Sequence, residues 1–400
     1  MESNDIQNLL TQVAAINKKY ENIEAITGSN FNIFKILKME YNEVKTHSAF
    51  IAELLKPNGS HGQKETFLKS FVRCFNIPEI IENQPIDFNK TEVEVEESSD
   101  NGRIDIVLKF NNGKVVVIEN KIHAQDQESQ LARYKNDYPD CYLIYLTLSG
   151  DKASDSSIKW SEKSMELHHF EECSKGEKCP HCYYTYSYKN DMLKWLIECH
   201  KESSNFPILR ETITQYINLI KQLTHQTMSD EQKNELVKII VSNSNYIDAA
   251  GSIQESWENI KYEIIEQMRV KIFNHAYLAQ NSLKVAHDTQ LGERESSFWF
   301  FKDNWNYCIE FYFGETHESI AIGICKKVKE IPTNSELEKL ICESLNTIEK
   351  TKNYPDWIWV VDFQLWSNTD WKDIIKVIPD EVIKTVDKIV RNLETSQIQL

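Results

Sequence analysis

Three charged residues interrupt two neighbouring strand-like segments and carry the clearest chemical signal in this sequence. Asp105 lies in the alternating segment 103–110, and Glu119 and Lys121 end a run of Val and Ile residues. Burying such charges is costly unless they are paired or bind a metal ion. Two carboxylates and an ammonium group suit metal-assisted hydrolysis of a phosphodiester, in which a hard cation polarises phosphate and activates water.

The turn between these two segments decides whether the charges share a face. If residues 112–113 formed a two-residue loop, Asp105 would face Asn120, and each face would mix polar and apolar side chains. If residues 111–113 form a loop whose glycine is left-handed, Asp105 lies opposite Glu119. One face then carries Asp105, Glu119 and Lys121, and the other carries Ile104, Ile106, Leu108, Val116 and Ile118. The hydrophobic pattern favours the three-residue loop.

Along the chain around this hairpin, the spacing of apolar residues changes from a helical period to the alternation of strands and then back to a helical period. Apolar spacing predicts helices over residues 6–20, 31–38, 40–55 and 67–75. Alternation then predicts a meander of strands over 91–96, 103–110 and 114–121, followed by a helix over 124–138 and a strand over 141–148. The predicted core is therefore a helix, three strands, a helix and a strand.

Several motifs in this core resemble those of the PD-(D/E)XK nuclease superfamily. Ile104-Asp105 matches the first half of the signature, with Ile in place of Pro, and Glu119-Asn120-Lys121 is a complete E-X-K. Residues 41–48 and 57–62, which contain Asn42-Glu43, His47-Ser48 and Pro57-Asn58-Gly59-Ser60-His61-Gly62, resemble the N-terminal signature of one branch. Residues 130–134 resemble its Q-L-X-X-Y helix. The resemblance covers roughly residues 31–223, and the later part of the chain also resembles the C-terminal part of that branch.

The resemblance implies a fold, an activity and a set of site residues. The fold would be α/β (mixed α+β) with a restriction-endonuclease-like core, and the cofactor would be magnesium or manganese. Asp105, Glu119 and Glu43 would hold the metal ion, with Glu43 acting directly or through water. Lys121 would assist the attacking water. Gln130 would position Lys121 or the scissile phosphate, and Tyr134 would support both.

Other His and Cys residues leave alternatives open. His47 lies one helical turn after Glu43, so it could position a phosphate, bond to that carboxylate, or satisfy a neighbouring backbone group. The polar insertion at residues 149–182 could assemble a structural zinc site, because zinc takes Cys and His ligands at short spacings. Its candidate ligands are His169, Cys173, Cys179 and Cys182. The alternative is an exposed loop with reactive thiols.

Length and composition limit the classes of protein to which this chain can belong. The chain has 400 residues, 45 basic against 61 acidic, and 41% hydrophobic residues, which suits a soluble protein of two or three domains. We expect a nuclease domain over 1–227 and a second domain over 228–400, with helices and a smaller α/β unit whose sheet is mainly antiparallel. No apolar run approaches the ~20 residues of a membrane-spanning helix. The acidic N-terminus does not resemble a secretory signal, so we expect a cytoplasmic protein.

The expected function is therefore a metal-dependent endonuclease in bacterial (antiviral) defence or restriction, with double-stranded DNA as the first candidate substrate. The net charge of −16 does not exclude a local basic groove, since binding depends on the charges in contact. Two alternatives remain: a ribonuclease, and a nucleic-acid-binding or regulatory module that does not cleave. The C-terminal domain could bind DNA, form a homodimer or dock a protein partner.

Overall fold

The structure is a computed structural model that describes most of the chain. The described residues are 3–77, 86–99, 101–122, 124, 126–172, 181–293, 296–315, 319–326, 357–362 and 371–395. They form two compact units, one of Leu10–Lys238 and one of Met1–Leu9 with Ile239–Leu400. The division falls inside helix α10 (Asp230–Val241), whereas the sequence predicts a boundary near Thr227, in the loop before this helix.

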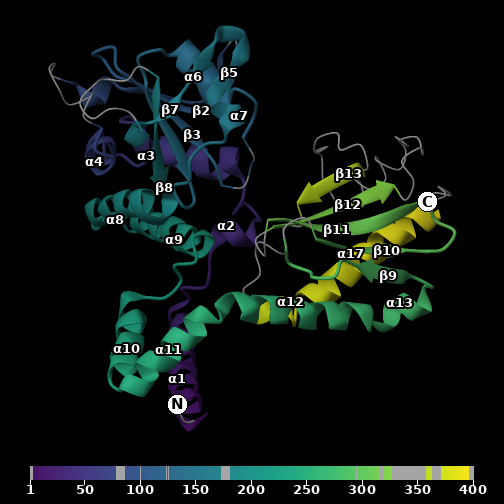
Figure 1. Ribbon diagram of the computed structural model, residues 1–400. Helices are drawn as coiled ribbons and strands as arrows, with labels where there is room; N and C mark the ends of the chain where they lie inside the picture. The colour runs from purple at the N-terminus through teal and green to yellow at the C-terminus, as the bar shows by residue number, and fades with distance from the viewer. Residues whose placement is uncertain are drawn as a thin grey trace. The chain divides into compact units, whose positions relative to one another are not determined.

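A six-stranded mixed sheet forms the centre of the first unit, in the order β1-β2-β3-β4-β8-β7 (Figure 1). Its strands are β1 (Glu92–Ser99), β2 (Gly102–Lys109), β3 (Val115–Asn120), β4 (Tyr142–Thr147), β7 (His168–His169) and β8 (Cys182–Ser187). The first three form an antiparallel meander, and β4 and β8 then add in parallel. The predicted order of helix, three strands, helix and strand is confirmed.

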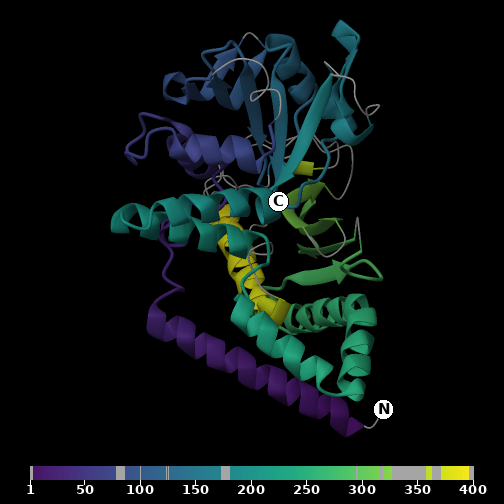
Figure 2. The same cartoon turned by 90° about the vertical axis from the view of Figure 1, so that its left-hand side faces the viewer.

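Helices cover both faces of this sheet (Figures 1 and 2). One face packs against α3 (Ala49–Leu55), α4 (Thr66–Cys74), α8 (Leu193–Glu202) and α9 (Pro207–Leu223). The other packs against α6 (Gln130–Asp137) and α7 (Asp155–Ile158). Alternation along the strands creates both cores, because Ile106 and Ile118 enter the first and Val107 and Val117 enter the second.

The hairpin between β2 and β3 has the predicted three-residue loop. Phe110 N donates to Lys114 O at 2.9 Å, and Gly113 is left-handed with a φ of 79°. A side chain at Gly113 would be strained in this conformation. The ladder pairs Ile106 with Ile118, and the same register places Asp105 opposite Glu119. The predicted register is confirmed.

One prediction about the faces of this hairpin is wrong. The sequence places Ile104 with Ile106, but Ile104 packs in the opposite core, beside Val107 and Val117. The ladder between β1 and β2 skips Glu96, which is left-handed with a φ of 55°. The pairs on either side keep one register, so Glu96 and Asp105 stand opposite each other without forming a regular ladder pair. The regular alternation of β2 therefore breaks at Asp105.

A five-stranded antiparallel sheet organises the second unit, in the order β13-β12-β11-β10-β9. Its strands are β9 (Lys284–His287), β10 (Ser297–Phe301), β11 (Tyr307–Glu315), β12 (Ser319–Lys326) and β13 (Trp357–Asp362). Phe298, Phe311 and Ile322 pack against α12 (Trp257–Phe273) and α17 (Ile378–Thr395). The predicted antiparallel sheet is confirmed, although β9 was not predicted. The sequence also predicts a helix over 336–348, and these residues lie outside the described ones.

The remaining elements are shorter or belong to the helical segments. They are α1 (Ser3–Thr27), α2 (Ile33–Ile36), η2 (Phe88–Lys90), β5 (Lys159–Trp160), η3 (Ser161–Lys163), β6 (Met165–Glu166), η4 (Phe170–Glu172), α11 (Ser244–Glu255), α13 (Ala276–Gln280) and α16 (Trp371–Ile374). Among the described segments, no helix has the length and apolar character needed to cross a membrane.

Candidate active site

Two π-helices lie beside the end of β3. The sequence predicts a continuous helix over residues 40–55, but its first part is the π-helix η1 (Glu43–Ser48), which then continues as α3. A second π-helix, η5 (Tyr188–Met192), follows β8 and leads into α8. Short π-helical turns are rare and occur frequently at functional sites. Their position indicates a candidate active site at the carboxyl end of β3.

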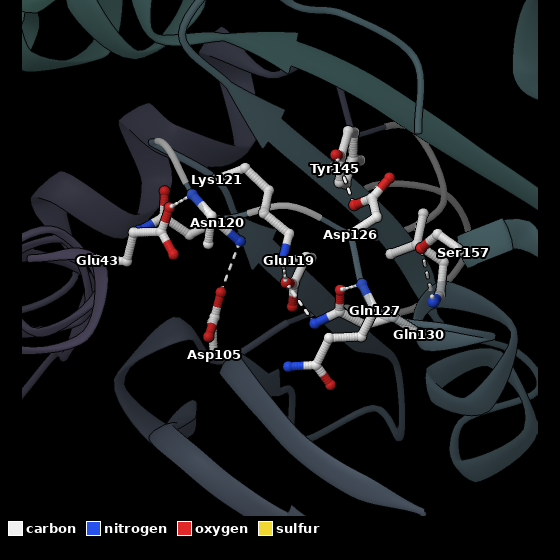
Figure 3. Close-up of polar contacts among 12 residues, drawn as sticks. Glu43, Asp105, Glu119, Asn120, Lys121, Asp126, Gln127, Gln130, Tyr145 and Ser157 are labelled. Atoms are coloured by element: carbon white, nitrogen blue, oxygen red, sulfur yellow. Dashed lines mark hydrogen bonds and ion pairs between the residues drawn. The ribbon is translucent and has the colours of Figure 1, made fainter. Parts of the chain in front are cut away.

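Asp105 and Glu119 come together across the hairpin, as predicted. They point toward a common region with Lys121 (Figure 3). Asp105 Oδ2 accepts a hydrogen bond from the backbone N–H of Asn120 at 2.8 Å. Burial, and then the nearby charge of Glu119, raise the pKa of Asp105 to about 8. In the absence of a cation, Asp105 therefore holds a proton near neutral pH.

Glu119 has one oxygen with two donors and one oxygen with none. Its Oε1 accepts from Lys121 Nζ at 2.8 Å and from Gln130 Nε2 at 2.7 Å. Its Oε2 is buried and has no hydrogen-bond partner. Burial raises the pKa of Glu119, and the charge of Lys121 acts in the opposite direction. A buried carboxylate oxygen without a donor is costly, and a cation bound at this atom would offset that cost.

Lys121 is an almost fully buried ammonium group that stays charged. Burial alone would lower the pKa of Lys121, but the adjacent Glu119 carboxylate raises it above its ordinary value. The backbone N–H of Lys121 also donates to Leu146 O at 2.8 Å, which continues the pairing of β3 with β4. The side chain therefore leaves a fixed backbone and reaches back to the carboxylate of the same motif.

Helix α6 supplies the groups that hold Glu119. Gln130 Nε2 lies 3.1 Å from Tyr134 OH, one turn along the helix, and Tyr134 OH donates to Arg103 O at 2.6 Å. The resemblance implied that Gln130 positions Lys121 or a phosphate, but in the structure it bonds to Glu119. Tyr134 is 1% exposed, so it supports this arrangement from inside the protein.

Glu43 holds the segment that follows Lys121. Its Oε1 accepts from the backbone N–H of Ile122 at 2.6 Å and from that of Ala124 at 2.9 Å. Within the described residues, no three His, Cys, Asp or Glu side chains form a group that could hold a metal ion. Asp105 and Glu119 stand opposite each other in the hairpin register and are the candidate ligands considered below, and the metal role of Glu43 stays a prediction.

His47 lies where it cannot contact substrate in this structure. It is fully buried, and its Nε2 is 2.9 Å from Glu40 O. A carbonyl only accepts, so Nε2 carries the proton, and in the neutral ring Nδ1 then accepts from Tyr216 OH at 2.9 Å. Of the alternatives that the sequence left open, the structure shows a histidine that satisfies a backbone group.

The candidate zinc ligands are only partly described. His169 Nε2 lies 2.9 Å from Thr185 Oγ1. In the pair of β7 with β8, His169 faces Tyr183, and His168 faces Cys182. Cys173 and Cys179 lie outside the described residues. The described part of the chain contains no group of His, Cys, Asp and Glu side chains that could hold zinc. Cys182 is disulfide-bonded in this structure and offers no thiolate to zinc, so the predicted set of four ligands is not formed here.

The donors at the end of β3 fit a hard divalent cation. Asp105 and Glu119 offer carboxylate oxygens, and the buried Glu119 Oε2 lacks any other partner. Magnesium prefers oxygen ligands and is commonly held by one or two carboxylates together with water. Manganese accepts the same ligands. Asp105 and Glu119 would hold such an ion, which when bound would act as a Lewis acid and activate water.

Asp105 should make the stability of the cation-free protein depend on pH. Its pKa in the folded protein is about 8, against 3.8 for an ordinary aspartate side chain. Between these values the folded state binds a proton that the unfolded state releases, so the free energy of unfolding should fall as pH rises. We expect a decrease on the order of a few kcal/mol between pH 5 and 8 in EDTA. Thermal unfolding should show this slope in the parent and a much smaller slope in Asp105→Asn.

Comparison with known proteins agrees with this geometry. Residues 31–218 match the family model described as the PD-(D/E)XK nuclease superfamily. No curated protein and no solved structure shows a significant match to the chain. The matched segment contains Glu43, Asp105, Glu119, Lys121 and Gln130, together with the meander and the helices that cover it. This match over residues 31–218 supports a nuclease-type function.

Proposed function

We propose that residues 31–218 form a metal-dependent endonuclease that hydrolyses DNA phosphodiester bonds, with a role in bacterial defence or restriction. The observation that carries this proposal is the buried Glu119 carboxylate. One of its oxygens is bound by Lys121 and Gln130, and the other has no partner. An oxygen that faces a cation needs no donor, whereas a purely structural ion pair would leave this atom unsatisfied.

Each side chain has a role in this proposal. Asp105 and Glu119 would hold magnesium or manganese, which would supply Lewis acidity toward phosphate and water. Lys121, held 2.8 Å from Glu119 Oε1, orients that water or offsets the negative charge that develops on phosphate. Gln130 keeps the Glu119 carboxylate in one orientation through its 2.7 Å hydrogen bond. Asp105 would hold the ion in its ionised form, because a cation requires the ionised carboxylate.

A panel of substrates tests this proposal. Supercoiled circular DNA, linear duplex DNA, single-stranded DNA and RNA are incubated with magnesium, manganese or EDTA. The proposal expects nicking or linearisation of circular DNA with either ion and none in EDTA. Cleavage of RNA alone would replace it by a ribonuclease. Well-folded protein that binds DNA but cuts nothing under any condition would favour a binding or regulatory module.

A matched pair of lysine variants shows whether the cleavage belongs to this site. Lys121→Ala should lose cleavage, whereas Lys109→Ala should retain it. Lys109 lies on β2 and also pairs with carboxylates, at 2.8 Å from Glu97 and 3.1 Å from Glu94, but not with Glu119. Equal cleavage by both variants would show that the nuclease activity comes from elsewhere, including from a contaminant.

A further inference from the structure

Asn120, the middle residue of the E-X-K motif, makes buried hydrogen bonds with both its side chain and its backbone, although the motif specifies no residue type at this position. Asn120 is fully buried, in a strand that otherwise consists of Val, Ile and Glu. Its Nδ2 donates to Ser48 Oγ at 3.0 Å, and its Oδ1 accepts from Tyr188 OH at 2.7 Å. Ser48 is the last residue of the π-helix η1, and Tyr188 is the first residue of η5. One amide side chain therefore joins β3 to both π-helices.

The backbone around Asn120 binds the acidic residues of the site. The N–H of Asn120 donates to Asp105 Oδ2 at 2.8 Å, and the N–H of Ile122 donates to Glu43 Oε1 at 2.6 Å. These two amides stand on either side of Lys121. Any rotation of the peptide at Asn120 would therefore move the donor to Asp105 and change the direction in which Lys121 leaves the strand.

The end of β3 needs such support because its regular pairing is incomplete there. On the β4 side, Asn120 pairs with Leu146. On the β2 side, the ladder ends at the pair of Ile106 with Ile118, and the Asp105 side chain receives the next N–H of the strand. A buried amide that loses its partners costs about 1–3 kcal/mol, so the bonds to Ser48 and Tyr188 select one orientation of Asn120.

We propose that Asn120, Ser48 and Tyr188 are positioning residues that fix Asp105 for cation binding and Lys121 for cleavage. This inference rests on the proposed function, because it assumes that Asp105 is a cation ligand. It assigns a functional role to residues that contact neither the phosphate nor the ion. Groups that orient metal ligands from behind typically contribute about 10–100-fold to metal affinity or activity.

The test removes one hydroxyl group and leaves the aromatic ring. Tyr188→Phe deletes the donor to Asn120 Oδ1. The matched control is Tyr186→Phe, two residues earlier, which deletes a hydroxyl group that lies 2.9 Å from Tyr142 OH on β4 and does not contact Asn120. Ser48→Ala removes the other bond of the amide and provides a second, smaller change.

Calorimetric titration with manganese, without nucleic acid, gives a readout that is independent of cleavage. We expect Tyr188→Phe and Ser48→Ala to weaken manganese affinity about tenfold. Tyr186→Phe should bind manganese as tightly as the parent does, even if its unfolding temperature falls as much as that of Tyr188→Phe. In cleavage assays, the two test variants should lower kcat and leave KM for nucleic acid unchanged.

The outcomes separate this inference from the proposed function. If the parent binds manganese and cleaves, but Tyr188→Phe and Ser48→Ala match the parent, the three residues are structural and only the positioning inference fails. The same conclusion follows if Tyr186→Phe weakens binding as much as Tyr188→Phe. If the parent neither binds manganese nor cleaves, the proposed function fails, and the positioning inference fails with it.

Discussion

Replacing Glu119 by glutamine is expected to abolish cation binding and to lower phosphodiester cleavage by about a thousandfold or more. The substitution preserves the shape of a side chain that is 1% exposed, so the fold should survive. It removes the negative charge that balances Lys121, and it replaces one carboxylate oxygen by an N–H₂ group that cannot bind a cation. Calorimetry with manganese and a plasmid-nicking assay would measure the two effects.

Glu97→Gln is the matched control for this substitution. Glu97 is also a partly buried carboxylate that pairs with a lysine, because its Oε1 lies 2.8 Å from Lys109 Nζ. It belongs to β1, and no contact links it to Glu119. Loss of manganese binding in Glu119→Gln alone supports the site. Retained binding and cleavage in Glu119→Gln would exclude Glu119 as a ligand.

Replacing Lys121 by methionine is expected to separate cation binding from cleavage. Methionine keeps the length of the side chain but removes the ammonium group 2.8 Å from Glu119 Oε1. Cleavage should fall about 10²–10⁴-fold, the usual contribution of a group that transfers or stabilises charge in the transition state. Manganese affinity should be unchanged or higher, because Glu119 no longer shares its charge with an ammonium group.

The stability of Lys121→Met should depend on the cation. Without an ion, Glu119 would be a buried charge with no cationic partner, which is strongly destabilising. The unfolding temperature in EDTA should therefore fall below that of the parent, and saturating manganese should restore it. Cleavage at the parental rate would show that Lys121 has no part in the reaction. A loss of manganese binding would show that the ammonium group organises the carboxylates.

The parts of the fold that the sequence predicts are those with a regular hydrophobic period. Strict alternation in β2 and β3, with a left-handed Gly113, was enough to select the register that places Asp105 opposite Glu119. The alternation gave the wrong face for Ile104, because the ladder to β1 is interrupted opposite Asp105, at the left-handed Glu96, and the sequence of β2 alone does not show this interruption. Strand β9 has only four residues, and Lys284 and His287 at its ends hide its pattern.

The sequence predicts the site residues that residue type and strand pattern identify, and it misses the roles that depend on tertiary contacts. Asp105, Glu119 and Lys121 follow from charge within an apolar pattern. The burial of His47 depends on Tyr216, a residue of the distant helix α9 that no local pattern connects to it. The bonds of Glu43 to two backbone amides are equally non-local. Asn120 gave a signal, a polar residue in an apolar strand, but its partners Ser48 and Tyr188 could not be found from spacing.

The most direct test of the account is the position of a bound manganese ion. Crystals of the parent protein grown or soaked with manganese would be measured at a wavelength where the ion scatters anomalously. The account predicts an anomalous peak between the carboxylates of Asp105 and Glu119, in contact with Glu119 Oε2, and no peak there in Glu119→Gln. A peak at another site, in protein whose cleavage requires manganese, would contradict it.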